Sequence, residues 1–574
     1  MATVLSPATV VQKPFRRGFD YTTLFWIGTA VILAILILNP IFYLFKESFT
    51  AKGDEGGWTL LNYVEAFSNP LYYSPIVATL WISLSVGVLS LVIGASISWC
   101  VSRTDIPMAN MIRNLILASF VTPPFLGAIA WIFLAGPREG WLNDIFRAVT
   151  FAGDDSYLFN IFSLGGVIFA ITLYTFPLVF IVVMAALNNI SSDIEDAANI
   201  AGGGTFSTMV NITLPLVLPA LFAGFIMAVL EAMILFGTPA ILAIPARMHV
   251  MTTQLRAFMA SEENLVGLAA AYSMPMLVVA VWLIYSRGRI LGKRGFATVG
   301  GKGGQRRPQK LGAWRYPVLA LCLIPLACAV VLPYVALLLT SFMRTLGGGL
   351  TWDNMTFANY VFIWNNDAVW GSIGNTIGLA VSAATAAAGL AGVIAYVSQR
   401  RIVWGHQYMS FLATLPIAIP GIVLAVGLFA AYTKQPFVLY GTLWIMFFAY
   451  LTKYLPLAFQ TSNAALMSVH PELEECSRIL GANRIQVFWD VTIPLFKVGL
   501  VASWILVFMP SLRELSASVL LWTTNTKVIS VVIIDLYEEN LLGAISALGV
   551  VLLLITLVAV LAGFRLAGRD FMKA

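Results

Sequence analysis

The sequence predicts an all-α integral membrane protein with about twelve transmembrane helices, arranged as two parallel six-helix repeats. Three observations carry this prediction. Of the 574 residues, 59% are hydrophobic and 10% are charged, and the mean hydropathy is +0.87, which excludes a soluble globular protein. Apolar runs long enough to cross a bilayer recur along the whole chain. One polar segment occurs twice at a fixed spacing, which marks an internal duplication.

We expect six spans in each half, with boundaries accurate to within several residues. The predicted spans are 24–45, 75–101, 112–135, 161–187, 217–243, 265–286, 316–338, 373–397, 407–431, 441–466, 497–522 and 541–565. The first run is too long for a signal peptide and no small-residue cleavage site follows it, so we expect it to remain. With both termini inside, 22 of the 33 Lys and Arg residues lie on the inner side, nine outside and two within spans. This distribution satisfies the positive-inside rule.

The duplicated polar segment lies between apolar runs at residues 191–215 and again at 470–494. One shift of 279 relates the matching carboxylate, glycine and proline positions, which are Asp196 and Glu475, Gly202 and Gly481, and Pro215 and Pro494. Earlier in each half the shift is larger, at 293 to 297 for Pro40 and Pro333 or Asn62 and Asn359. The drift predicts insertions in the connecting loops.

Each copy of the segment predicts a short helix, a break and a second helix. Ser191 or Ser192 can cap the first helix of copy one, and Pro471 fits a first helical position in copy two. Acidic residues follow at the positive end of both helices. Gly202 and Gly481 suit a left-handed C-cap that stops the helix. The prolines that follow open the next apolar run, where a missing backbone donor costs least.

This pattern resembles the EAA motif of permeases in bacterial binding-protein-dependent ABC importers: Glu-Ala-Ala, three residues, Gly, nine residues and Ile-x-Leu-Pro. The first copy matches with Asp in place of Glu, and the second is looser. The resemblance implies that the motif residues couple transport to an ATPase; they are Glu195, Asp196, Ala197, Ala198, Gly202, Ile212, Leu214, Pro215, Glu475, Cys476, Ser477, Gly481, Val491, Ile493 and Pro494.

The resemblance covers nearly the whole chain and implies a type I ABC importer permease fold with both halves fused. The length, the Thr122-Pro-Pro and Gly136-Pro137 stretches and the segment 236–239 are most similar to the ferric-iron type. The implied division is an N-terminal segment with the first span (1–72), a first permease domain (73–286), a basic linker (287–315), the seventh span and its loop (316–370), a second permease domain (371–566) and a tail (567–574).

The resemblance also implies the partners: two copies of a cytoplasmic ABC ATPase, a periplasmic substrate-binding protein and the bilayer of the bacterial inner membrane, but no nucleic acid. The chain itself is expected to be no enzyme and to hold no cofactor, since ATP and Mg would bind to the ATPase. Ferric iron is the expected substrate; thiamine, a polyamine, aminoethylphosphonate or a phosphorylated sugar are alternatives. A self-sufficient secondary transporter is the rival from another class, but it leaves the duplicated motif unexplained.

The segment Arg287–Arg315 carries nine basic residues and no acidic one. It predicts a flexible cationic linker, which either retains the topology signal or contacts anionic lipid headgroups. Its glycines do not form a phosphate-binding loop, because Gly295 is one place off the required spacing from Lys302 and a glycine replaces the expected Ser or Thr.

Ionisable residues inside spans are costly and are therefore functional candidates. Glu231 falls near the middle of the fifth predicted span, and Arg513 and Glu514 fall in its counterpart. They either line the substrate path or form a structural pair between helices. Lys453 is expected to extend its amine towards an interface. Prolines near positions 123 and 420 predict breaks in the third and ninth spans.

Overall fold

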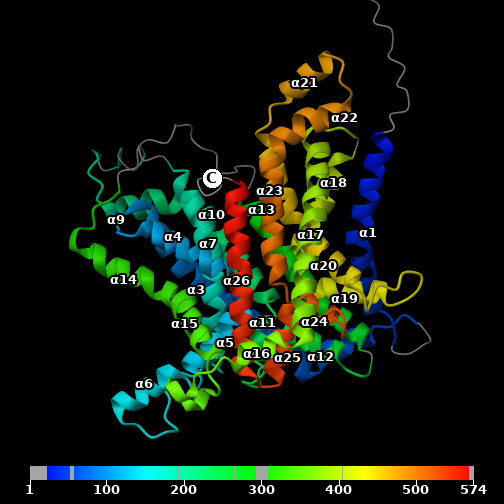
Figure 1. Ribbon diagram of the computed structural model, residues 1–574. Coiled ribbons are helices and arrows are strands. Elements are labelled where there is room, and N and C mark those ends of the chain that lie inside the picture. The colour runs from blue at the N-terminus through cyan, green and yellow to red at the C-terminus, as the bar shows by residue number, and fades with distance from the viewer. Residues whose placement is uncertain are drawn as a thin grey trace, which may run out of the picture.

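The structure is a computed structural model that describes residues 22–51, 57–190, 194, 197–198, 200–263, 265–291, 308–403 and 405–567. These ranges are almost entirely helical, and the only β pairing within them consists of three isolated bridges. Figure 1 shows the long helices running side by side, with α21 (Pro471–Ile479) at one end and α6 (Trp141–Thr150) at the opposite end. We refer to these as the motif end and the opposite end.

The first half and the second half contain corresponding helices in the same order. The first half contains α1 (Thr22–Ser48), α2 (Leu61–Ser68), α3 (Pro70–Arg103), α4 (Ala109–Val121), α5 (Pro124–Ala135), α6, α7 (Leu164–Asn188), α9 (Thr205–Thr208), η1 (Met209–Thr213), α10 (Leu214–Ile234), α11 (Gly237–Leu242), α12 (Met251–Met259) and α13 (Val266–Leu291). The second half contains η2 (Gly312–Trp314), α14 (Arg315–Leu326), η3 (Ala327–Val331), α15 (Leu332–Ser341), η4 (Leu346–Gly348), η5 (Trp352–Asn354), α16 (Ala358–Trp364), α17 (Asp367–Gln399), α18 (His406–Thr414), η6 (Leu415–Ala418), α19 (Gly421–Tyr432), α20 (Leu443–Met467), α21, α22 (Arg484–Val487), η7 (Phe488–Thr492), α23 (Ile493–Leu512), α24 (Ser518–Leu521), α25 (Ile529–Glu538) and α26 (Leu542–Ala567).

An insertion in the first half explains the drift of the repeat offset. The starts of α5 and α19 differ by 297 positions, whereas the starts of α7 and α20 differ by 279. The first half therefore has 18 additional residues between these two helices, and α6 lies among them. The predicted loop insertion is confirmed.

Nine helices in the described ranges are long and apolar enough to cross a membrane, and two bent pairs raise the number to eleven. The helix at the remaining predicted position is α20, which has the length of α7 but contains Lys453, Gln460 and Asn463. Its polar residues lower its hydropathy without shortening it. The predicted multi-spanning all-α fold is confirmed.

Four predicted spans are broken within their length. The α4 and α5 axes differ by 101°, and the His406–Ala418 segment differs from α19 by 110°. The breaks fall at Pro123-Pro124 and at Pro420, where proline removes a helical donor and restricts the preceding residue. The fifth and eleventh spans were expected as continuous helices, but α10 ends at Ile234 and α23 ends at Leu512. Short helices follow each of these ends instead.

The two halves are interlocked through their first spans. Helix α1 packs against α19 of the second half, and α15 packs against α5 of the first half. The contact is close: a Cβ atom on Gly427 in α19 would lie 2.6 Å from the carbonyl oxygen of Pro40 in α1. Each half thus contributes a helix that covers the bent pair of the other half, and the halves form one helical body.

Small residues allow the second-half helices to approach closely. Helix α17 packs against both α20 and α23, and its buried face is rich in alanine between Ala380 and Ala395. A Cβ atom on Gly392 would lie 2.7 Å from a methyl carbon of Leu500 in α23. Small side chains of this kind allow tight helix packing in a membrane, and they place the end of α17 beside the duplicated polar segment.

Candidate functional site

The second copy of the duplicated segment folds as its sequence predicts. Pro471 occupies the first position of α21, directly after His470, and Glu472 and Glu474 lie in the first turn. Gly481 follows the helix with φ +97°, and Gly202 in the first copy has φ +87°. A Cβ atom at either glycine would meet nothing within 4 Å, so the strain of the left-handed backbone is what disfavours another residue there.

Part of the first copy lies outside the described residues, including Ser191, Ser192, Glu195 and Asp196. Their capping and motif positions therefore stay predictions. Ala197 and Ala198 lie in the described part and are helical.

A π-helical turn follows the break in both copies at equivalent positions. Ile212 lies in η1 and Val491 lies in η7, and in each turn the following residue donates its N–H to a carbonyl five residues back. Pro215 and Pro494 then occupy the first turn of α10 and α23. A proline cannot donate to the carbonyl four residues back, and the widened turn accommodates that loss.

Apolar side chains project from the tips of both copies. Ile200 is 89% exposed and its repeat equivalent Ile479 is 84% exposed, while Leu480 next to it is 88% exposed. Cys476 and Glu475 are also exposed on α21, and Ser477 is half-buried. Large apolar residues thus remain exposed at equivalent places in both copies.

A buried ion pair attaches α21 to the membrane helices, and the motif pattern did not reveal it. Arg400 follows α17, and its Nε donates to Glu474 Oε1 at 3.0 Å while its Nη2 donates to the carbonyl of Val469 at 2.9 Å. Thr492 in η7 donates its hydroxyl to the same carboxylate oxygen at 3.0 Å. Of the two adjacent carboxylates, Glu474 therefore points into the protein, whereas Glu475 is exposed.

The first half repeats part of this arrangement. Arg103, which is 297 positions before Arg400, donates from Nη2 to the carbonyl of Leu187 at 2.9 Å and to that of Ile190 at 3.5 Å. Ile190 is the equivalent of Val469 at the offset of 279. The recurrence of an arginine at the end of the second span in both halves is the sequence signal that could have identified these residues.

The buried charges pair differently from the sequence-based expectation. Glu514, which is 4% exposed, accepts a hydrogen bond from Lys453 Nζ at 2.6 Å, from the hydroxyl of Tyr454 and from the N–H of Ala517 at 3.0 Å. Lys453 was expected to extend towards an interface. That expectation is wrong, because a buried carboxylate one helix away provides a stronger partner than the interface does.

One of the two alternatives from the sequence pairs Arg513 with a carboxylate, but no ion pair within 4.0 Å joins it to Glu231 or Glu514. Its Nη1 donates instead to the carbonyls of Phe120, at 2.6 Å, and Thr122, at 3.0 Å. Pro124 has no N–H to offer to Phe120, so the break between α4 and α5 leaves this carbonyl without its helical donor. Arg513 supplies the missing donor.

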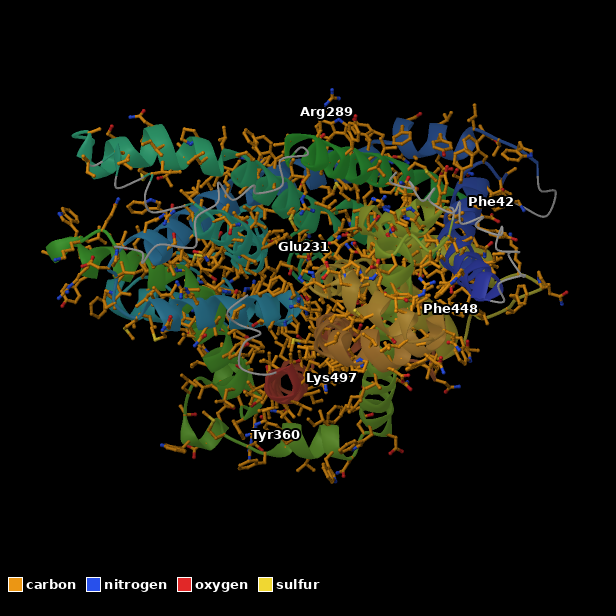
Figure 2. All side chains as sticks on the ribbon, turned by 90° about the horizontal axis from the view of Figure 1, so that it is seen from above. Phe42, Glu231, Arg289, Tyr360, Phe448 and Lys497 are labelled. Atoms are coloured by element: carbon orange, nitrogen blue, oxygen red, sulfur yellow. The ribbon has the colours of Figure 1, made fainter. Side chains whose placement is uncertain are left out.

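Glu231 lies in the last turn of α10, not near the middle of a continuous span, because α10 ends three residues later. Its side chain is exposed. Figure 2, which looks along the bundle, places Glu231 near the centre of the molecule, where the two halves meet. The carboxylate is therefore not covered by the side chains of the described residues.

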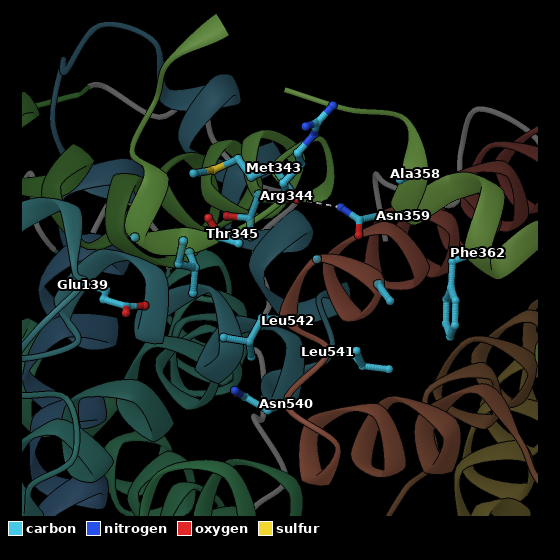
Figure 3. Close-up of a pocket in the computed structure, with 15 residues that line it drawn as sticks. Glu139, Met343, Arg344, Thr345, Ala358, Asn359, Phe362, Asn540, Leu541 and Leu542 are labelled. Carbon is cyan, nitrogen blue, oxygen red and sulfur yellow. Dashed lines mark hydrogen bonds between the residues drawn. The ribbon is translucent and has the colours of Figure 1, made fainter. Parts of the chain in front are cut away.

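A separate cavity of about 460 Å³ opens at the end of α15, beside α16 and the start of α26 (Figure 3). Residues from both halves line it, among them Glu139, Arg344 and Asn359. The Asn359 Nδ2 donates to the carbonyl of Met343 at 2.8 Å and holds the loop after α15 in place. None of the candidate functional residues from the sequence is among the residues that line this cavity.

Comparison with known proteins gives a consistent picture. The family described as "Binding-protein-dependent transport system inner membrane component" matches residues 90–291 and 388–569. The ferric transport system permease protein FbpB of Actinobacillus pleuropneumoniae is 25% identical over 487 residues, which are 84% of this chain and 69% of the relative. The spermidine/putrescine transport system permease protein PotC of Escherichia coli is 24% identical over 245 residues, which are 42% of this chain and 90% of the relative.

Among solved structures, a bacterial ABC transporter that imports the acidic polysaccharide alginate contains a chain that is 19% identical. The match covers 45% of this chain and 95% of that chain, with a TM-score of 0.37. The family match accounts for two segments of similar length, one in each structural half, and together they cover more than half of the residues. The chain therefore belongs to the family of inner-membrane components of binding-protein-dependent transport systems, with two family domains fused in one polypeptide.

Proposed function

We propose that this chain forms the translocation path of an ATP-driven importer for ferric iron, delivered by a periplasmic binding protein. The observation that carries the choice of substrate is the 25% identity to ferric transport permeases across 84% of the chain in one relative and 78% in another, since these matches extend through both halves. Relatives named for polyamine and 2-aminoethylphosphonate transport match only 42% of the chain.

The arrangement of charge supports a cationic substrate. The two half-buried cations of the predicted spans are engaged: Lys453 bonds to Glu514, and Arg513 donates to backbone carbonyls. Glu231 forms no ion pair with any described residue and remains exposed near the centre. A carboxylate in this position would attract a cation moving along the path and would repel a free phosphonate.

Two ATPase subunits would dock on the motif end. The described residues among those predicted for coupling lie there, and the exposed Ile200, Ile479 and Leu480 offer apolar anchors on each copy. The motif helices would transmit the closure of the ATPase dimer into α10 and α23, which begin directly after the π-helical turns. Transport would then follow from a rigid-body switch between two states of the permease. In this arrangement both termini lie in the cytoplasm.

The test is reconstitution of the chain in proteoliposomes with its candidate ATPase and binding protein. We expect uptake of radiolabelled ferric iron that requires ATP, the ATPase and the binding protein together. Uptake that is displaced by spermidine or by 2-aminoethylphosphonate would assign another substrate. Uptake by the chain alone, driven by a proton gradient, would refute the importer and favour a secondary transporter.

A further inference from the structure

Three residues from three elements meet at one carboxylate oxygen at the motif end. We call the set Arg400, Glu474 and Thr492 the Arg400 joint. Arg400 Nε and Nη2 lie 3.0 and 2.9 Å from Glu474 Oε1, and the Thr492 hydroxyl donates to the same atom at 3.0 Å. The joint connects the end of α17, the motif helix α21 and the π-helical turn η7.

The joint is shielded from water. The Arg400 side chain is 14% exposed, the Glu474 side chain is 9% exposed and Thr492 is fully buried. A buried ion pair of this kind adds little net stability compared with apolar residues of the same size, because both charges lose their hydration. What it provides is a defined geometry between the elements that it connects.

The chain itself connects α21 to the membrane helices only through short non-helical links. After α21 come Leu480, the left-handed Gly481 and two further residues before α22 begins. Before α21, only residues 468–470 separate it from α20. A force applied to α21 would be reduced by bending at these links. The joint bypasses both links, because Arg400 lies at the end of a 33-residue helix.

The first half carries an equivalent arginine. Arg103 lies at the end of α3, as Arg400 follows α17, and it donates to carbonyls at the end of α7 and just beyond it. An arginine at the end of the second span therefore recurs in both halves, and in the described part of the first half it bonds to the segment that leads into the first copy.

We propose that Arg400 is a positioning residue that couples the motif helix α21 directly to α17, the second span of its half. Displacement of α21 would then move α17 at the same time as α23, and these two helices already pack against each other. The inference rests on the proposed function, because the displacement is supplied by a docked ATPase.

The experiment measures uptake per ATP hydrolysed and thermal stability for the reconstituted complex carrying Arg400→Met, Glu474→Gln or both. Each single substitution leaves a buried group without its charged partner, so we expect lower stability. We expect the double variant R400M/E474Q to recover most of the stability, since neither charge remains, while uptake per ATP stays about tenfold below wild type. Glu472→Gln, which removes an exposed acid from the same helix, is the matched control for stability and should leave it unchanged.

The outcomes separate three conclusions. A joint that only stabilises the fold predicts that the double variant regains both stability and uptake per ATP, which would overturn the proposal. Unchanged uptake per ATP in Arg400→Met would overturn it as well, while leaving the importer function intact. A wild-type complex without ATP-dependent uptake would refute the proposed function itself, before any variant is compared.

Discussion

The Lys453–Glu514 pair provides the most direct test of how the centre of the protein is held together. We expect Lys453→Met to destabilise the protein, because Glu514 would remain charged and buried without its cation. Breaking a buried pair costs about 3 to 5 kcal/mol. Since the Tyr454 hydroxyl and the Ala517 N–H would still donate to the carboxylate, we expect about 3 kcal/mol, the lower end of that range.

The volume at the site should change little, because methionine can fill the space that the lysine chain occupies over Gly421. A Cβ atom on this glycine would lie 2.8 Å from Lys453 Nζ. The loss of stability would therefore measure the effect of the unpaired charge, because the substitution leaves no cavity. Glu514→Gln combined with Lys453→Met should recover most of the stability, because no buried charge is then left alone.

The assay is the thermal midpoint of the purified protein in detergent, compared among variants at one scan rate. Lys527→Met is the control, since Lys527 pairs with Asp535 at 2.7 Å but both side chains are about a quarter exposed; we expect a loss of at most about 1 kcal/mol there. Equal midpoints for Lys453→Met and Lys527→Met would refute the reasoning, as would a double variant that is less stable than both singles.

Three other predictions address the motif, the centre and the orientation. The double substitution of Gly202 and Gly481 by valine should abolish most uptake while the chain still inserts, because valine resists the left-handed backbone; full uptake would contradict a coupling role. Glu231→Gln should alter uptake but leave ATPase assembly intact, and Arg513→Met should lower the thermal midpoint by freeing two carbonyls; normal uptake and a normal midpoint would show that neither residue matters. Reporter fusions should read cytoplasmic after Ser191, Gly303 and Ala574, and external after Glu55, Asp155 and Glu539; one well-expressed fusion on the wrong side would overturn the topology.

The sequence predicted the repeat and the local conformations well, because both depend on patterns within a short stretch. The left-handed conformation of Gly202 and Gly481 follows from a helix stop that only glycine adopts without strain. The breaks at Pro123-Pro124 and Pro420 likewise follow from the lost donor and the restricted preceding residue. Such features need no knowledge of which helices are neighbours.

The charge partners could not be predicted, since they depend on packing between distant segments. Glu514 has two candidate cations within the predicted spans, Lys453 and Arg513, and hydropathy does not choose between them. The choice is made by α20, which brings Lys453 within 2.6 Å of the carboxylate. Arg400 was counted only as a topology signal, because its partner Glu474 is 74 residues away. The ends of α10 and α23 were also missed, because apolar residues continue past both ends.

Arg513 also bears on how motion passes between the halves. It lies directly after α23, which begins at the second motif, yet its guanidinium is bonded to the break between α4 and α5 in the first half. Because Pro124 has no N–H, the carbonyl of Phe120 needs a donor from outside its own helix. A contact between Arg513 and another backbone segment would not supply that donor. At the same place, a Cβ atom on Gly237 would lie 2.9 Å from a methyl carbon of Leu515. The point where α23 ends is therefore packed against both breaks of the first half, and a displacement of α23 from the motif end would act on the bent third span as well as on its own half.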